Sequence, residues 1–130
     1  ESALHEKPMP AKGDLETVMA GLACGEVSLI AWDILCTGVN DFITIPDSLV
    51  GPNMCLLADG VGGDMPIVAG ESAVAGMAVV LEANKDKELA SALGLGSNSS
   101  VLIFGTEGAS DPEIYQQLVG RCAKEVKLAS

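Results

Sequence analysis

Hydrophobic and polar positions follow a helical period in five segments of the chain. These segments are residues 29–38, 47–58, 71–83, 86–93 and 111–127. The segment 71–83 is apolar on all sides, which predicts a buried helix, whereas the segment 86–93 is expected to be exposed.

Small polar residues stand where three of these helices need an N-cap. The candidates are Ser28 for the first helix, Asp47 or Ser48 for the second, and Ser110 or Asp111 for the last. Pro112 suits the first position of the last helix, because that position needs no N–H partner. Gly51-Pro52 is expected to interrupt the second helix.

Three shorter segments are apolar and predict strands, of which the first and the last suit strands that are buried on both faces. They are residues 41–45, 67–69 and 100–105. Since helices and strands alternate, the pattern predicts an α/β fold in which the helices pack on a small parallel sheet.

The length of 130 residues suits one domain. Residues 1–13 contain two prolines and a glycine and show no periodicity, so we expect an extended arm there and the folded domain over residues 14–130. Aromatic residues make up only 3% of the chain, which predicts a core of Ala, Val, Leu, Ile and Met.

The charge is strongly negative and limits the partners that the chain can bind. Eighteen Asp and Glu face seven Lys and Arg, for a net charge of −11. A surface with so few cations disfavours nucleic acid and anionic membranes as partners. No apolar run reaches the roughly 20 residues of a membrane-spanning helix.

The cysteines do not predict a metal site. Cys24, Cys36, Cys55 and Cys122 lack CxxC spacing, and His5, the one histidine, lies in the arm. We expect the four thiols to be small buried hydrophobes in a reducing compartment, the cytoplasm, although their spacing alone leaves a disulfide open.

Two segments are placed for chemistry by the predicted sheet. Ligands of open parallel sheets bind beyond the carboxyl ends of the strands, which selects Gly105–Gly108 and Gly70–Ser72. The second segment opens a helix, whose free N–H groups can bind an anion or a polar ring atom. The alternative is that Thr106 and Glu71 only cap turns and helices, and spacing alone favours capping.

Three segments carry a family resemblance. TVMAGLACGE (17–26), VAGESAVAGMAV (68–79) and VLIFGTEGASDPEIY (101–115) resemble the C-terminal third of fold-type-II pyridoxal-phosphate enzymes, the tryptophan synthase β-like group. Within that group the chain is most similar to the diaminopropionate ammonia-lyase family. The segments stand in the order of the family, and the resemblance spans about residues 14–120.

The resemblance implies an enzyme with a pyridoxal 5′-phosphate cofactor and a small amino-acid substrate. Such enzymes use the cofactor as an electron sink. The ammonia-lyases convert 2,3-diaminopropionate to pyruvate and ammonia by α,β-elimination, and relatives act on serine and threonine by the same logic. A homo-oligomeric parent enzyme is also implied.

By the same resemblance, three residues match positions at the cofactor. Thr106 matches the hydroxyl residue that faces the pyridine nitrogen, and Glu71 matches the glutamate that opens the helix beside the cofactor. Gly21 matches a glycine whose backbone lies against the cofactor. No catalytic residue and no metal ligand is assigned to this chain.

The family's Schiff-base lysine and its glycine-rich phosphate loop lie N-terminal to the matched segments, and neither occurs here. The chain also begins with Glu in place of Met. We therefore expect a C-terminal fragment of an ammonia-lyase, inactive alone, whose partner is the missing N-terminal part. Two alternatives are a free-standing, non-catalytic module derived from the lyase scaffold and a fragment of a serine or threonine dehydratase.

Overall fold

A computed structural model describes residues 1–128 of the chain as a set of short helices joined by long loops. The α-helices are α1 (Ser2–His5), α2 (Leu29–Gly38), α3 (Val50–Asp59), α4 (Ala75–Lys85), α5 (Lys87–Ala92), α6 (Pro112–Val119) and α7 (Ala123–Leu128). Short 3₁₀ helices are η1 (Ala20–Leu22), η2 (Asp47–Leu49), η3 (Val61–Gly63) and η4 (Glu71–Ala73).

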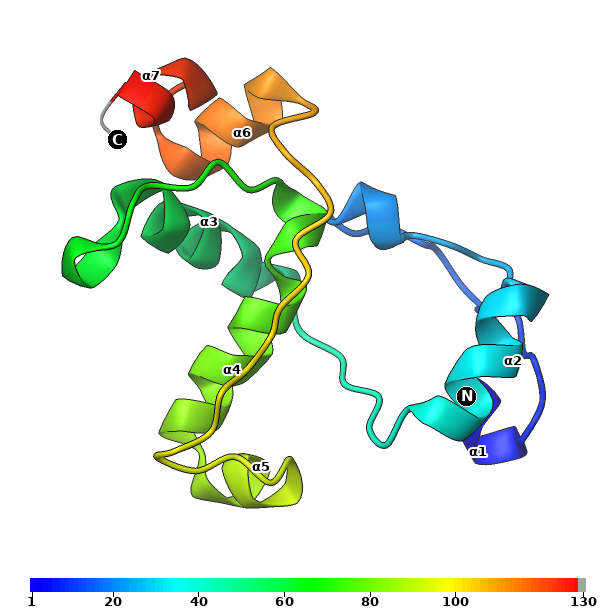
Figure 1. Ribbon diagram of the computed structural model, residues 1–130. Helices are drawn as coiled ribbons and strands as arrows, with labels where there is room; N and C mark the ends of the chain where they lie inside the picture. The colour runs from blue at the N-terminus through cyan, green and yellow to red at the C-terminus, as the bar shows by residue number, and fades with distance from the viewer. Residues whose placement is uncertain (129–130) are drawn as a thin grey trace.

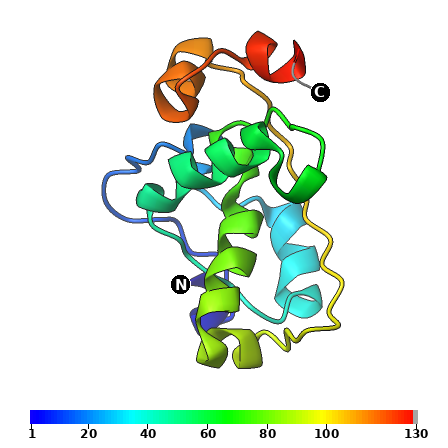
Figure 2. The same cartoon turned by 90° about the vertical axis from the view of Figure 1, so that its left-hand side faces the viewer.

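The helices form three groups in space. Figure 1 shows α3, α6 and α7 gathered together, with α1 and α2 set apart on the other side of the molecule. In both views α4 runs away from α3 and meets α5 at its far end (Figure 2). Residues 1–13, expected as an arm, include the helix α1.

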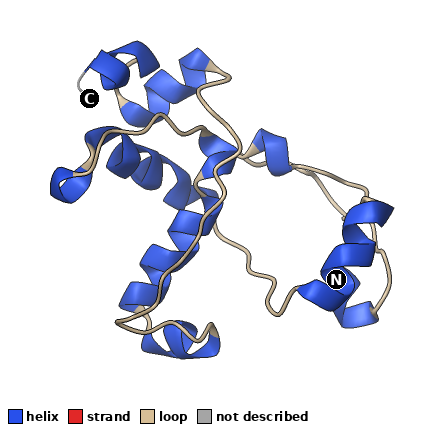
Figure 3. Cartoon of the chain, viewed as in Figure 1, coloured by secondary structure: helices blue, strands red, loops and turns tan. Residues whose placement is uncertain are grey.

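The prediction of a parallel sheet is wrong, because residues 1–128 contain no β-strand (Figure 3). The segments 41–45, 67–69 and 100–105 run as loops. A strand requires backbone hydrogen bonds to a neighbouring strand about 4.8 Å away, and an apolar composition does not supply that neighbour.

Two of these segments border one groove without pairing. Asp41 and Ile43 line this groove together with residues 101–104 and Gly76 of α4. The segments are thus near one another, but the described part of the chain provides no strand between them. The helical part of the predicted fold is present, whereas its sheet is absent from residues 1–128.

The segment 101–107 nevertheless keeps the alternation of a strand. The side chain of Ile103 lies 3.1 Å from the position of a Cβ atom added at Gly76. Leu102 and Phe104 are each 79% exposed, whereas Val101 is 46% exposed and Ile103 is 38% exposed. The segment therefore packs one face on α4, and the prediction that it is buried on both faces is wrong.

The core lies where α3, η4, α6 and α7 meet. Its buried hydrophobic members are Met19, Val50, Met54, Ala58, Ala69, Ala73, Val74, Tyr115 and Val126. The predicted aliphatic core is confirmed except for Tyr115, which is the largest of the fully buried side chains. Burial raises the pKa of the Tyr115 hydroxyl.

Three helices begin where the sequence predicts. Ser28 Oγ accepts the Ala31 N–H at 3.3 Å at the start of α2. Asp86 caps α5 and Asp111, one of two candidates, caps α6, each by accepting two N–H groups of the first turn. These caps act within four residues of the chain, so local sequence is sufficient to place them.

The start of α3 differs from the prediction. Neither Asp47 nor Ser48 caps this helix, since both lie in the preceding turn η2 and α3 begins at Val50. Pro52 does not interrupt α3, because it lies in the first turn, where backbone N–H groups have no partner within the helix.

The last predicted helix is divided in two. It ends at Val119, and Gly120 follows with a φ of 82°, a left-handed conformation that glycine adopts without steric cost. The chain then turns into α7, so the prediction of one helix over 111–127 is wrong.

The expectation that all four cysteines are buried is also wrong. Cys24 and Cys36 are exposed, Cys55 and Cys122 are half-buried, and all four thiols are free. Cys36 lies on α2, which has no buried residue. Within residues 1–128 no helix has both the length and the apolar character needed to cross a bilayer.

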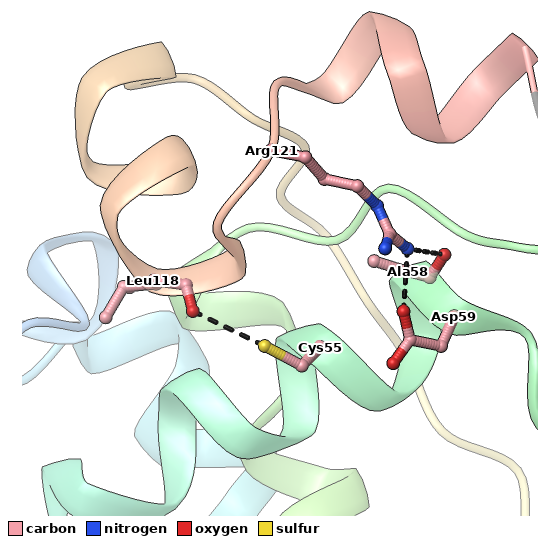
Figure 4. A network of polar contacts seen from close by, with 5 residues as sticks. All are labelled: Cys55, Ala58, Asp59, Leu118 and Arg121. Atoms are coloured by element: carbon pink, nitrogen blue, oxygen red, sulfur yellow. Dashed lines mark hydrogen bonds and ion pairs between the residues drawn. The ribbon is translucent and has the colours of Figure 1, made fainter.

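The junction of α6 and α7 is anchored on the C-terminal end of α3 (Figure 4). Arg121 Nη2 donates to the carbonyl oxygen of Ala58 and, at 2.8 Å, to Asp59 Oδ1. The last carbonyls of a helix lack partners within it, and a cation there also meets the negative end of the helix dipole. Cys55 Sγ donates to the Leu118 carbonyl at 3.4 Å and adds a second link between α3 and α6.

We expect Arg121→Gln to lower the free energy of unfolding by about 1–2 kcal/mol, because the buried Ala58 loses a charged donor. Asp59→Asn should cost less than about 0.5 kcal/mol, since the Asp59 side chain is 57% exposed and solvent weakens its ion pair. Urea denaturation measures both. Lys124→Gln removes an exposed cation from α7. An equal loss in this control would show that overall charge, and not the Ala58 contact, is responsible.

Candidate functional site

Three segments that are distant in sequence meet at η1 and η4. Gly21 lies in η1 and Ser72 lies in η4. A Cβ atom added at Gly21 would stand 2.8 Å from Ser72 Oγ and 3.5 Å from Glu107 Oε1. Each of the three segments that carry the family resemblance therefore contributes one residue to this cluster.

Glu107 makes the polar contacts that join the cluster. Its Oε2 accepts the Ser72 N–H at 2.6 Å, and its Oε1 accepts the Ser110 hydroxyl at 3.2 Å. Its main-chain carbonyl accepts the Gly70 N–H at 3.0 Å. The expectation that Gly70–Ser72 offers free N–H groups to an anion is therefore wrong for Gly70 and Ser72, because Glu107 already binds both.

The backbone of the loop after residue 104 lies directly against the turn that opens α4. A Cβ atom at Gly70 would overlap the carbonyl oxygen of Gly108 and would lie 2.7 Å from Glu107 Cγ. Only glycine permits this approach, since any other residue would place a carbon atom where backbone already stands. Gly70 is thus required for Glu107 to reach Ser72.

The three residues expected at a cofactor do not share one environment. Gly21 contacts the cluster directly, and Glu71, next to Ser72, is buried at 5% exposed. Thr106 is exposed and precedes Glu107. The hydroxyl of Ser72 is buried and has no hydrogen-bond partner among the described residues.

The sequence pattern assigns no function to Glu107 or Ser110, although Glu107 lies in the selected segment Gly105–Gly108. One signal was available, because alternation along 101–107 places residue 107 on the same face as Ile103. An acidic residue on the face that packs against a helix N-terminus indicates a contact with N–H groups. The contact of Gly21 with Ser72 and Glu107 could not be predicted from the sequence, since it depends on how η1 is placed in the fold.

Asp47 holds the segment that carries Gly21 against the start of α3. Thr17 Oγ1 donates to Asp47 Oδ1 at 2.6 Å, and the Val18 N–H donates to Oδ2 at 2.7 Å. Both hydrogen bonds lower the pKa of Asp47 below its usual 3.8, and the bond from Thr17 has the larger effect. Met19 then enters the core, so the segment that leads into η1 is held by Asp47 and by the core.

Comparison with known proteins gives one consistent result. No protein-family model matches the chain. It is 37% identical over 131 residues to diaminopropionate ammonia-lyase of Salmonella typhimurium LT2, covering 95% of this chain and 32% of that protein. The Escherichia coli K12 protein of the same name is 36% identical over 110 residues, which cover 82% of this chain and 28% of that protein.

Solved structures agree with the sequence matches. The Escherichia coli diaminopropionate ammonia-lyase in complex with an aminoacrylate-PLP azomethine intermediate has a TM-score of 0.81 at 31% identity, over 91% of this chain and 30% of that chain. The complex of the same Escherichia coli lyase with D-serine has a TM-score of 0.74 at 35% identity, over 83% of this chain and 29% of that chain. The predicted resemblance is confirmed, and the chain spans about a third of the length of the curated relatives that it matches.

We expect the loss of stability in Gly→Ala variants to depend on which atoms the new methyl group contacts. Gly70→Ala should lower the free energy of unfolding by about 2–3 kcal/mol, because the methyl group overlaps backbone that cannot move aside. Gly21→Ala should cost about 1 kcal/mol, since the Ser72 hydroxyl can rotate away. Urea denaturation measures the series. At Gly108 an added Cβ atom has no neighbour within 4 Å, so Gly108→Ala is the control. A loss there as large as at Gly70 would contradict the steric explanation.

The hydrogen bonds of Asp47 predict a pH dependence. The pKa of Asp47 is lowered in the folded state, so its contribution to stability is complete above the unfolded value of 3.8 and is lost as the pH falls through the folded value. The stability difference between wild type and Asp47→Asn should be constant near neutral pH and should shrink below about pH 3.8. Thermal unfolding over a pH series measures it. Asp41→Asn, at an exposed loop carboxylate, should show no such change, and a parallel change in both variants would contradict the prediction.

Proposed function

We propose, from the homology of this chain to a C-terminal part of diaminopropionate ammonia-lyase, that it forms the part of a pyridoxal 5′-phosphate site that contacts the pyridine ring. The reaction of the complete enzyme is the α,β-elimination of 2,3-diaminopropionate to pyruvate and ammonia. One observation carries the proposal. The three segments that resemble the family converge at Gly21, Ser72 and Glu107.

The residues of this cluster suit the ring of the cofactor. The exposed hydroxyl of Thr106 is available to polar atoms of a ligand, and the buried hydroxyl of Ser72 has no hydrogen-bond partner among the described residues. Gly21 is exposed, so its backbone is accessible to a flat group. The carboxylates of Glu71 and Glu107 disfavour a phosphate, and the described contacts of the cluster include no lysine or arginine.

The chemistry of these residues is compatible with elimination. Pyridoxal 5′-phosphate, when bound, supplies the electron sink. In our proposal Thr106 binds the pyridine nitrogen through a neutral hydroxyl, which need not transfer a proton to it, so that the sink is weaker than with a carboxylate. Gly21 and the turn that contains the buried Glu71 would lie beside the ring. None of these residues moves the substrate proton.

The remainder of the site is proposed to come from the other two thirds of the lyase. That part would supply the Schiff-base lysine, the phosphate loop and the contacts that select the substrate, so this chain alone would be inactive. Exposed apolar side chains support such a partner, since Ile30 of α2 is 79% exposed, Ile34 is 66% exposed and Phe104 is 79% exposed. Patches of this kind mark surfaces that other protein covers, in the same subunit or in a homo-oligomer.

Titration of the isotope-labelled chain with pyridoxine 5′-phosphate tests the ring contacts by NMR. This probe lacks the aldehyde and cannot form imines with surface lysines. Concentrations up to about 10 mM should shift the amide signals of Gly21, Ser72 and Thr106, as weak binding requires. Thr106→Val keeps the shape of the side chain but removes the hydroxyl, and it should weaken binding about tenfold.

Thr37→Val is the matched control, because it removes an exposed hydroxyl from α2. The absence of shifts at the three amides, or equal binding by Thr106→Val and wild type, would overturn the assignment. Incubation with pyridoxal 5′-phosphate and 2,3-diaminopropionate should yield no pyruvate above a protein-free control. Pyruvate formation by the chain would overturn the proposal that the remaining part is needed.

A further inference from the structure

Glu107 is the residue through which the parts of the candidate site are connected. Its two carboxylate oxygens bind the Ser72 N–H at 2.6 Å and the Ser110 hydroxyl at 3.2 Å. One of them also lies 3.5 Å from the position of a Cβ atom on Gly21. The bond to Ser72 has the short length of a charge-assisted hydrogen bond, which is about twice as strong as a neutral one.

The contacts of Glu107 decide which way its neighbour Thr106 points. Successive side chains of extended backbone point to opposite faces. The Cβ position of Gly105 lies 3.6 Å from Ala73 Cβ, and the Glu107 side chain reaches Ser72, so both residues face η4. Thr106, between them, faces outward and is exposed.

A shift of the segment by one residue would reverse this arrangement. It would turn the Thr106 hydroxyl into the packed face and bring the carboxylate of Glu107 out, because the side-chain period is two. No neighbouring strand among residues 1–128 holds the register of this segment. The register is therefore held by the hydrogen bonds of the Glu107 side chain and by the bond that the Gly70 N–H donates to the Glu107 carbonyl.

We propose that Glu107 is a positioning residue. It holds the Thr106 hydroxyl outward, toward the ring, and it holds the Ser72 hydroxyl beside Gly21, while it does not itself contact the cofactor or the substrate. The inference rests on the proposed function and extends it to a residue that acts through Thr106 and Ser72.

Amide hydrogen exchange of Ser72, measured by NMR, tests the bond directly in the full chain. Glu107→Asp keeps the charge but shortens the side chain by one methylene, so the carboxylate no longer reaches Ser72. Glu107→Gln keeps the length and an acceptor oxygen. We expect exchange at Ser72 to be about tenfold faster in Glu107→Asp and in Glu107→Ala, and within about threefold of wild type in Glu107→Gln.

Glu113→Gln is the matched control, because it makes the same change at an exposed position of α6 and should leave Ser72 unchanged. If Glu107→Ala does not fold, exchange at Ser72 is compared between Glu107→Asp, Glu107→Gln and wild type. Equal exchange in wild type, Glu107→Asp and Glu107→Gln would overturn the inference.

Pyridoxine 5′-phosphate provides the second measurement. We expect its affinity, followed at the Thr106 amide, to fall about tenfold in Glu107→Asp and to recover in Glu107→Gln, whereas loss of packing alone would not separate these two variants. Undiminished affinity in Glu107→Asp would overturn the positioning role. A wild-type chain that does not respond to the probe overturns the proposed function, and Ser72 exchange then decides by itself whether Glu107 holds the register.

Discussion

The loop around residue 107 lies against the turn η4 so closely that a side chain at Gly70 would overlap the carbonyl oxygen of Gly108. This backbone approach is the constraint on which the site depends. It brings the Glu107 carboxylate within 2.6 Å of the Ser72 N–H. Because Gly21 lies against the Ser72 hydroxyl, three distant segments become one cluster. A methyl group at position 70 would separate them.

The site lies at the edge of the core. Met19 and Ala73 enter the core directly beside η1 and η4, so both turns of the site are tied to buried side chains. The helix α2 has no such support, since none of its residues is buried. The turns of the candidate site are therefore tied to the core, whereas α2 exposes Ile30 and Ile34. This distribution suits a chain whose outer faces are covered by further protein.

The homology and the geometry bear on the same residues. Similarity to diaminopropionate ammonia-lyase covers about a third of that protein, and within this third the matched segments converge on one cluster. The cluster offers hydroxyl groups, open backbone and carboxylates. These groups fit a neutral aromatic ring better than a phosphate, which supports our proposal that a cofactor site is divided between two parts of one enzyme.

Local features of the sequence determined several helix starts, and tertiary contacts decided the rest. Ser28 and Asp111 place helix starts because each binds N–H groups within three residues of itself. The family resemblance could also be recognised from the sequence, since the order of the motifs does not depend on folding. The predicted strands failed because a strand needs backbone partners that its own sequence cannot supply. Glu107 and Ser72, 35 positions apart, become partners only when a glycine lets two backbones touch.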